Sequence, residues 1–222
     1  MDMDPASFLH TVSVAAIPIV FAITVHEVSH GWAARHFGDR TAELLGRLSL
    51  NPIRHVDPVG TVLVPAILLL LPGNFLFGWA KPVPVDARNM RNPRANMVWV
   101  SAAGPAANIA MAIIWALLMM LSQRLALGTA GLWIEEMSTY GIYFNVMLAV
   151  FNMLPIPPLD GGQVLINLLP RGSLSTLLLR MAPFGLFAVL ILLATGVLWP
   201  FIVGPVEAIV GLLATAFGLQ FR

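Results

Sequence analysis

Long apolar stretches alternate with short polar stretches along the whole sequence. The apolar stretches lie at about residues 7–34, 96–122, 137–154 and 181–221. A helix needs about 20 predominantly apolar residues to cross the hydrocarbon core of a bilayer, and the last stretch is long enough for two short helices. The pattern therefore predicts an all-α polytopic membrane protein with about five transmembrane segments.

One stretch does not fit this pattern. Only about a dozen continuous apolar residues follow Gly60 before Pro72 and Gly73, which is too short for a transmembrane helix. The next residues, FLFGWAKPVPV at 75–85, alternate in polarity and contain two prolines. Prolines and interfacial aromatic residues are typical of an edge strand at a membrane surface. We therefore expect a re-entrant or interfacial β-like hairpin here, which does not cross the membrane.

The basic residues indicate how the chain is oriented in the membrane. Eight of the twelve Lys and Arg residues lie between positions 35 and 94, two more lie at 171 and 180, and the stretch 123–136 holds only Arg124. Short loops rich in Lys and Arg usually face the cytoplasm. We expect the N-terminus and a polar loop at 123–136 to lie outside, and the segments 35–60 and 161–180 to lie in the cytoplasm.

The composition supports a membrane location and limits the other possibilities. The 222-residue chain is 58% hydrophobic and only 10% charged, whereas soluble domains are about 25% charged. The predicted spans use nearly all of the chain, so we expect residues 1–222 to form a single integral-membrane domain. The net charge of +1 and the lack of a basic run do not indicate a nucleic-acid partner. The chain has no cysteine, so any metal site must use His and carboxylate ligands.

The first apolar stretch ends in three ionisable residues, in the sequence HEVSH at 26–30. Residues four positions apart share one face of a helix, so His26 and His30 can bind one metal ion, while Glu27 projects to the side. In zinc peptidases with this H-E-x-x-H arrangement, two imidazoles bind zinc and the acid activates a water molecule. An uncompensated charge deep in a span costs roughly 2.5–3.5 kcal/mol, which favours a functional role for these residues.

A catalytic zinc site needs a third protein ligand. The candidates are His36, Glu43, His55, Asp57, Asp86 and Asp160. Asp160 differs from the others because it ends an apolar, proline-broken segment, NMLPIPPLDGG at 152–162. Irregular backbone at membrane depth is tolerated where it lines a cavity. The predicted topology puts Asp160 and HEVSH on the same side of the membrane, so we expect them to meet.

HEVSH and the downstream NMLPIPPLDGG together resemble the site-2 protease family of intramembrane zinc metalloproteases, whose second motif reads roughly N-x-x-P-x-P-x-L-D-G. The stretches LGRLSLNPIRHVDPVGTVLVP, FGWAKPVPV and AGPAAN look like the compact prokaryotic branch of that family, for which we expect neither a PDZ nor a CBS domain. The resemblance covers about residues 20–170 and not the C-terminal apolar segments at 181–221.

The resemblance implies one zinc ion bound by His26, His30 and Asp160, with Glu27 as the catalytic acid/base. It also implies a multi-pass protein of a prokaryotic plasma membrane whose active site lies near the cytoplasmic side. Family members cleave a transmembrane segment of another membrane protein, so the expected partners are such a substrate and the lipid bilayer. The alternative is a zinc-binding membrane transporter or metal-delivery protein, which the position of Glu27 beside the two imidazoles disfavours.

Two further predictions concern the substrate. Asn152 is a candidate donor to the substrate backbone or to the oxyanion that forms during hydrolysis. The β-like segment with Phe75, Phe77 and Trp79 is a candidate edge to which an extended substrate adds as a strand. Asn108 has the same two interpretations, a contact to the substrate or an interhelical hydrogen bond, and we favour the structural one. Asn145 is interpreted as structural.

Overall fold

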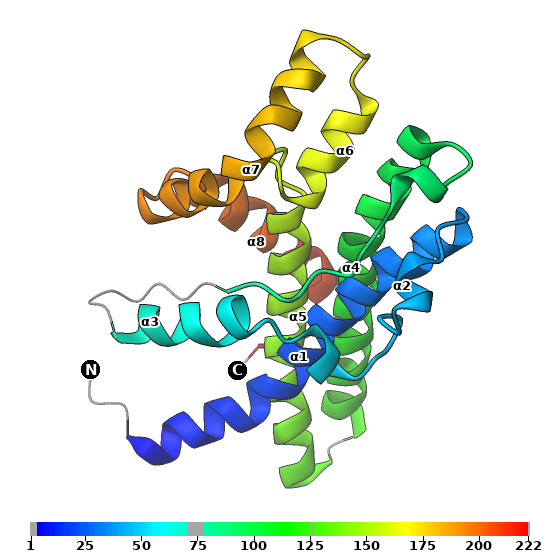
Figure 1. Cartoon of the computed structure of the whole chain (residues 1–222). Coiled ribbons are helices and arrows are strands. Elements are labelled where there is room, and N and C mark those ends of the chain that lie inside the picture. Colours follow the sequence, from blue (N-terminus) through cyan, green and yellow to red (C-terminus); the bar gives the residue numbers. More distant parts are fainter. Residues whose placement is uncertain (1–3, 71–77, 126, 222) are drawn as a thin grey trace.

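The computed structural model describes residues 4–70, 78–125 and 127–221, and these residues are mostly helical (Figure 1). The long helices in these ranges are α1 (Pro5–His36), α4 (Pro93–Leu125), α5 (Gly128–Asn152), α7 (Ser173–Ala194) and α8 (Trp199–Phe217). The shorter ones are α2 (Thr41–Leu44), η1 (Pro52–His55), η2 (Pro58–Leu63), α3 (Val64–Leu70), η3 (Ala87–Asn89) and α6 (Asp160–Leu168). The described ranges contain no strand.

Four of the described helices, α1, α4, α7 and α8, are long and apolar enough to cross a membrane. Helix α5 has 25 residues, which gives about 37 Å at 1.5 Å per residue, but it is more polar because it carries Glu135 and Glu136. It packs against α1, α4 and α8. The prediction of an all-α polytopic membrane protein is confirmed.

The predicted polar loop at 123–136 is wrong in its extent. Helix α4 continues to Leu125 and α5 already begins at Gly128. The first third of α5 contacts α1, where Glu136 Oε2 lies 3.2 Å from His10 Nε2. Residues 128–136, for which the sequence pattern suggested a loop, are therefore helical.

The predicted hairpin lies partly outside the described residues, since Phe75 and Phe77 belong to 71–77. The part before this gap is helical, in η2 and α3. The part after it, from residue 78 to residue 86, has no strand assignment. Its backbone is hydrogen-bonded to η2, because the amide of Trp79 donates to the carbonyl of Gly60 at 3.0 Å.

Helix α4 lies at the centre of the bundle and packs against α1, α5 and α6 (Figure 1). The second half of α4 joins α5, α8 and the residue Leu219 in an apolar cluster of Ala112, Ala116, Met119, Ile142, Val146, Val210, Leu213 and Leu219. A second cluster, between the loop after α5 and helices α7 and α8, contains Leu154, Val189, Leu193, Leu198 and Ile202. Helix α4 also packs against both α1 and α6, which brings the end of α1 and the start of α6 to the first half of α4.

Candidate active site

Three side chains that can bind a metal ion meet where α1, α4 and α6 converge. His26 and His30 come from α1, and Asp160 is the first residue of α6. The two Nε2 atoms lie 3.1 Å apart. Asp160 Oδ2 lies 3.3 Å from Nε2 of His26 and 3.4 Å from Nε2 of His30. Among the described residues, these three form the group of His and carboxylate side chains that could hold a metal ion.

The hydrogen bonds at the other ring nitrogens point both Nε2 lone pairs into this group. His30 Nδ1 lies 2.7 Å from the carbonyl oxygen of Val100, which can only accept, so this nitrogen carries the proton. His26 Nδ1 lies 2.6 Å from Oδ1 of Asn108. Protonation at Nδ1 leaves Nε2 of each ring as an acceptor or metal ligand.

The geometry of the group fits zinc. Zinc ligands at about 2.0–2.1 Å in a tetrahedral arrangement are separated by about 3.3–3.4 Å, and the three observed separations are 3.1, 3.3 and 3.4 Å. Asp160 Oδ2 is buried and has no hydrogen-bonding partner. Three electron-rich atoms this close together repel one another unless a cation lies among them, so the arrangement suits a metal ion.

Gly104 of α4 makes room for the two imidazoles. A Cβ atom at this position would lie 2.4 Å from His30 Nε2 and 2.7 Å from His26 Cε1. Any side chain here would therefore intrude on the group. The glycine belongs to the AGPAAN stretch, so this stretch fixes how closely α4 approaches α1.

The proline- and glycine-rich segment before α6 places Asp160. A Cβ atom at Gly161 would lie 2.2 Å from the carbonyl oxygen of Met153, and one at Gly162 would lie 2.3 Å from the nitrogen of Pro157. The start of α6 is thus packed directly on the backbone of the preceding loop. At the other end of α6, the guanidinium of Arg94 donates to the carbonyl of Ile166 at 3.1 Å and to that of Leu169.

Glu27 lies beside the three side chains and not among them. Its Oε2 accepts a hydrogen bond of 2.9 Å from the backbone amide of Val83, in the non-helical segment 78–86. A cavity of about 270 Å³ opens at this point. Its lining includes Glu27, His26, His30, Asp160, Val83, Asn152 and Gln163. Polar groups that converge in one cavity are typical of a catalytic site.

Asn152 lines this cavity, and its Nδ2 donates to the carbonyl of Leu148 in its own helix at 2.9 Å. Trp79 is not part of the lining. It packs over Gly60, where a Cβ atom would lie 2.3 Å from the indole Nε1. Phe75 and Phe77 lie outside the described residues.

The other candidate ligands are engaged elsewhere or lie outside the group. Glu43 forms ion pairs with Arg40 at 2.7 Å and with Arg35 at 3.2 Å. His55 Nε2 lies 2.8 Å from the carbonyl of Ser49. Asp57, Asp86 and His36 are also absent from the metal-binding group among the described residues. Glu43 and His55 are thus held by other partners.

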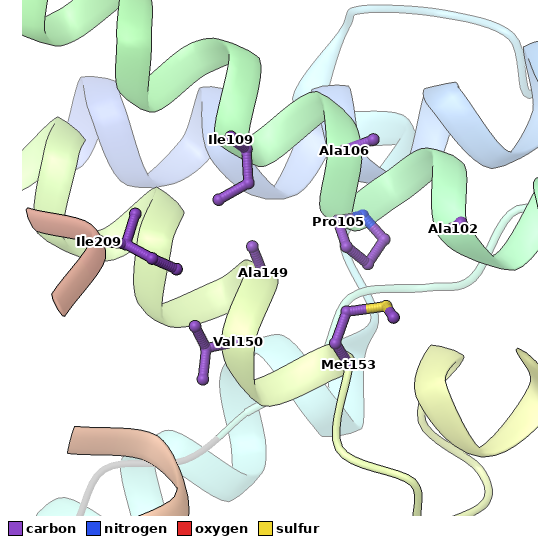
Figure 2. A pocket seen from close by; sticks show the side chains of 8 residues that line it. All are labelled: Ala102, Pro105, Ala106, Ile109, Ala149, Val150, Met153 and Ile209. Atoms are coloured by element: carbon purple, nitrogen blue, oxygen red, sulfur yellow. The ribbon is translucent and has the colours of Figure 1, made fainter. Parts of the chain in front are cut away.

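A second cavity, of about 350 Å³, lies between α4, α5 and α8 (Figure 2). Its lining is Ala102, Pro105, Ala106, Ile109, Ala149, Val150, Met153 and Ile209. None of these side chains is a His, Cys, Asp or Glu, so none is a usual zinc ligand or can transfer a proton. The smaller polar cavity is therefore the candidate site, although the apolar one is larger.

Comparison with known proteins agrees with the motifs and the site. Residues 14–132 and 125–195 match the model of peptidase family M50. The chain is 37% identical over 210 residues to "Putative zinc metalloprotease YwhC" of Bacillus subtilis, and the match covers 90% of this chain and 91% of that protein. It is 30% identical to "Putative zinc metalloprotease Rip2" of Mycolicibacterium smegmatis, over 71% of this chain and 58% of the relative. No solved structure gives a significant match.

The chain belongs to peptidase family M50, the site-2 protease family. Membership confirms the expected kind of enzyme, a zinc metallopeptidase of the membrane. The sequence favours a structural role for Asn108 without connecting it to His26, suggests only helix packing for Gly104, and indicates no role for Arg94. A polar amide and a glycine inside an Ala-rich span are the signals that could have drawn attention to two of these positions.

Proposed function

We propose that the chain is an intramembrane zinc endopeptidase in which His26, His30 and Asp160 hold the metal and Glu27 is the catalytic acid/base. The observation that carries this assignment is the triangle of two Nε2 atoms and one carboxylate oxygen, with sides of 3.1 to 3.4 Å. When bound, zinc lowers the pKa of a water molecule and polarises the scissile carbonyl.

The residues of the chain supply the proton transfers and the orientation. Glu27 takes a proton from the attacking water and later gives it to the leaving amine. The amide of Val83 holds one oxygen of Glu27 in place, and the carboxylate keeps further capacity to accept a proton. Asn152 lines the same cavity, and its second amide hydrogen is our candidate donor to the substrate or the oxyanion.

The position of Glu27 favours the peptidase over a zinc transporter. A transit site benefits from every available carboxylate ligand, yet Glu27 is absent from the metal-binding group and is hydrogen-bonded to Val83. A carboxylate held next to the ligands but outside the ligand set is the arrangement that water activation requires.

The test uses the different roles of Glu27 and Asp160. Glu27→Gln keeps the shape of the side chain but cannot take a proton, so cleavage should fall by about 10² to 10⁴ while zinc binding persists. Asp160→Ala leaves two imidazoles, so zinc should be largely lost together with cleavage. Metal analysis of detergent-purified variants and cleavage of a candidate membrane helix measure both effects. Zinc loss in Glu27→Gln with retention in Asp160→Ala would contradict both roles.

We propose that the substrate is a membrane protein cut in or near its transmembrane segment, and that the segment at 75–85 helps to present it. Pro82, Val83 and Val85 of this segment line the catalytic cavity, which supports a place for an extended substrate beside Glu27. Serine at both Phe75 and Phe77 should weaken cleavage and leave the zinc content unchanged. Loss of zinc would show instead that the segment is structural.

We also propose that the N-terminus lies outside and that the active site faces the cytoplasm. The end of α1 and the starts of α4 and α6 meet at the site, and the adjoining loops carry most of the basic residues, as the positive-inside rule requires. The chain has no cysteine, so single cysteines report topology cleanly. Leu44→Cys, at a site 78% exposed, should resist a membrane-impermeant thiol reagent in intact cells, whereas Leu127→Cys should react. The reverse pattern would refute the orientation.

A further inference from the structure

His26 has a side-chain partner that is buried deep in the bundle. Its Nδ1 lies 2.6 Å from Oδ1 of Asn108, which belongs to α4 and is 82 positions away in the sequence. Asn108 is completely buried and His26 is 6% exposed. Water therefore cannot replace this hydrogen bond if it is lost.

The other contacts of Asn108 fix which way its amide points. Its Nδ2 donates to the carbonyl of Ala22 at 3.2 Å and to Oδ1 of Asn145 at 2.9 Å. The carbonyl of Ala22 can only accept, so the nitrogen of the amide must face it and the oxygen must face His26. The Nδ1 of His26 then has to carry the proton, which leaves its Nε2 lone pair directed at His30 and Asp160.

Asn145 of α5 holds Asn108 in turn. Its Nδ2 donates to the carbonyl of Gly141 in its own helix at 2.8 Å, so its oxygen is free to accept from Asn108. Asn145 is completely buried. A continuous series of oriented hydrogen bonds therefore runs from α5 through α4 to the imidazole on α1.

We propose that Asn108 is a positioning residue that sets the tautomer and ring orientation of His26, and that Asn145 supports it. The proposal rests on the role of His26 as a zinc ligand given above. Partners of the second ring nitrogen generally fix the orientation of a metal-binding histidine, and their loss typically lowers metal affinity 10- to 100-fold. His30 is held by a backbone carbonyl instead, so of these two ring contacts only the one to Asn108 can be removed by changing a side chain.

A pair of variants separates positioning from general packing. Both Asn108→Leu and Asn108→Asp lack the donor to Ala22 and Asn145. Asn108→Asp also places a carboxylate oxygen against these two acceptors, so its structural damage is at least as large as that of Asn108→Leu. Only Asn108→Asp keeps an oxygen that can accept the proton of His26 Nδ1. We expect Asn108→Leu to lower metal affinity 10- to 100-fold and Asn108→Asp to bind at least about tenfold more tightly than Asn108→Leu.

The measurement is cobalt or zinc titration of detergent-purified protein in competition with a chelator. Ser122→Ala is the matched control, because it removes another buried hydrogen bond between α4 and α5, to the carbonyl of Gly131, far from His26. It should leave affinity unchanged. Equal affinities for Asn108→Leu and Asn108→Asp would overturn the proposal.

Three further measurements complete the test. Nitrogen-15 NMR of labelled histidine should show the Nδ1–H tautomer for His26 in the metal-free wild type and a mixture of tautomers in Asn108→Leu. An unchanged tautomer would also overturn the proposal. Addition of Asn145→Leu to Asn108→Leu should cause no further loss of affinity, because one series of hydrogen bonds is already broken. If His26→Ala leaves metal binding intact, the proposed ligand set fails. If His26→Ala weakens binding and Asn108→Leu does not, only the positioning role fails.

Discussion

Replacement of Gly104 by alanine should remove the metal without unfolding the protein. The added Cβ atom would lie 2.4 Å from Nε2 and 2.6 Å from Cε1 of His30. Carbon contacts are favourable at about 3.5–4.0 Å, so the ring has to move by about 1 Å. The ring is the end of a side chain, so it moves more easily than the helix backbone.

This shift affects metal binding more than folding. Overpacking in a core typically costs about 1–3 kcal/mol, but alanine in place of glycine inside a helix returns about 1 kcal/mol. The net loss of stability is therefore small. Movement of His30 by about 1 Å breaks either its contact with Val100, now 2.7 Å, or the triangle with His26 and Asp160. We expect metal affinity to fall at least as much as the 10- to 100-fold known for changes around metal ligands.

The assay is metal content and chelator competition on detergent-purified Gly104→Ala, together with thermal unfolding of the metal-free protein. Gly211→Ala is the matched control, since a Cβ atom there meets nothing within 4 Å. It should bind metal normally and be slightly more stable. If Gly104→Ala binds zinc as tightly as the wild type, the imidazoles do not pack on α4 as described and the reasoning is refuted.

Two more predictions concern the supports of the site. Arg94→Met removes the hydrogen bonds at the end of α6, so Asp160 at its start should be held less firmly and metal affinity should fall up to about tenfold. The exposed Arg91→Met is the control, and equal affinities would contradict the role of Arg94. Burial alone would raise the pKa of Asp39, but hydrogen bonds from Asn89, Thr41 and the amide of Asp86 hold this pKa below its usual 3.8. Asp39 therefore stabilises the fold above about pH 4, and this contribution is lost as the pH falls through its lowered pKa. Asp39→Asn should cost about 1–3 kcal/mol near neutral pH and less in acid, measured by unfolding in detergent. An equal loss of stability at neutral and acidic pH would contradict the proposed contribution of the Asp39 carboxylate.

Local rules predict the part of the site that lies within one helix. His26 and His30 are four residues apart, and the helical repeat alone places them on one face. Asp160 needed a second argument, from the topology, because no local rule links it to α1. The charge pattern and the proline-broken segment supplied that argument, and the structure brings the three side chains together.

Predictions from the sequence are wrong or missing where tertiary contacts decide the structure. The sequence suggested a loop at 123–136, but α4 reaches Leu125 and α5 begins at Gly128, and Glu136 of α5 lies 3.2 Å from His10 of α1. The contact between Glu27 and Val83 joins positions 56 residues apart. Its donor is a backbone amide, which carries no signal in the residue type, so no reading of side chains could find it.

Asn108 shows how such contacts become predictable in a membrane protein. A polar amide in a span has no water to form hydrogen bonds with. Its burial is therefore unfavourable unless it forms a hydrogen bond inside the bundle. Glycine and alanine flank Asn108 in AGPAAN and bring the neighbouring helices close, which limits the partners to residues at the same depth. His26 of α1 and Asn145 of α5 satisfy this condition, and the observed hydrogen bonds join these residues. An asparagine at the depth of a metal-binding histidine should therefore be tested first as its positioning partner, before it is assigned to helix packing alone.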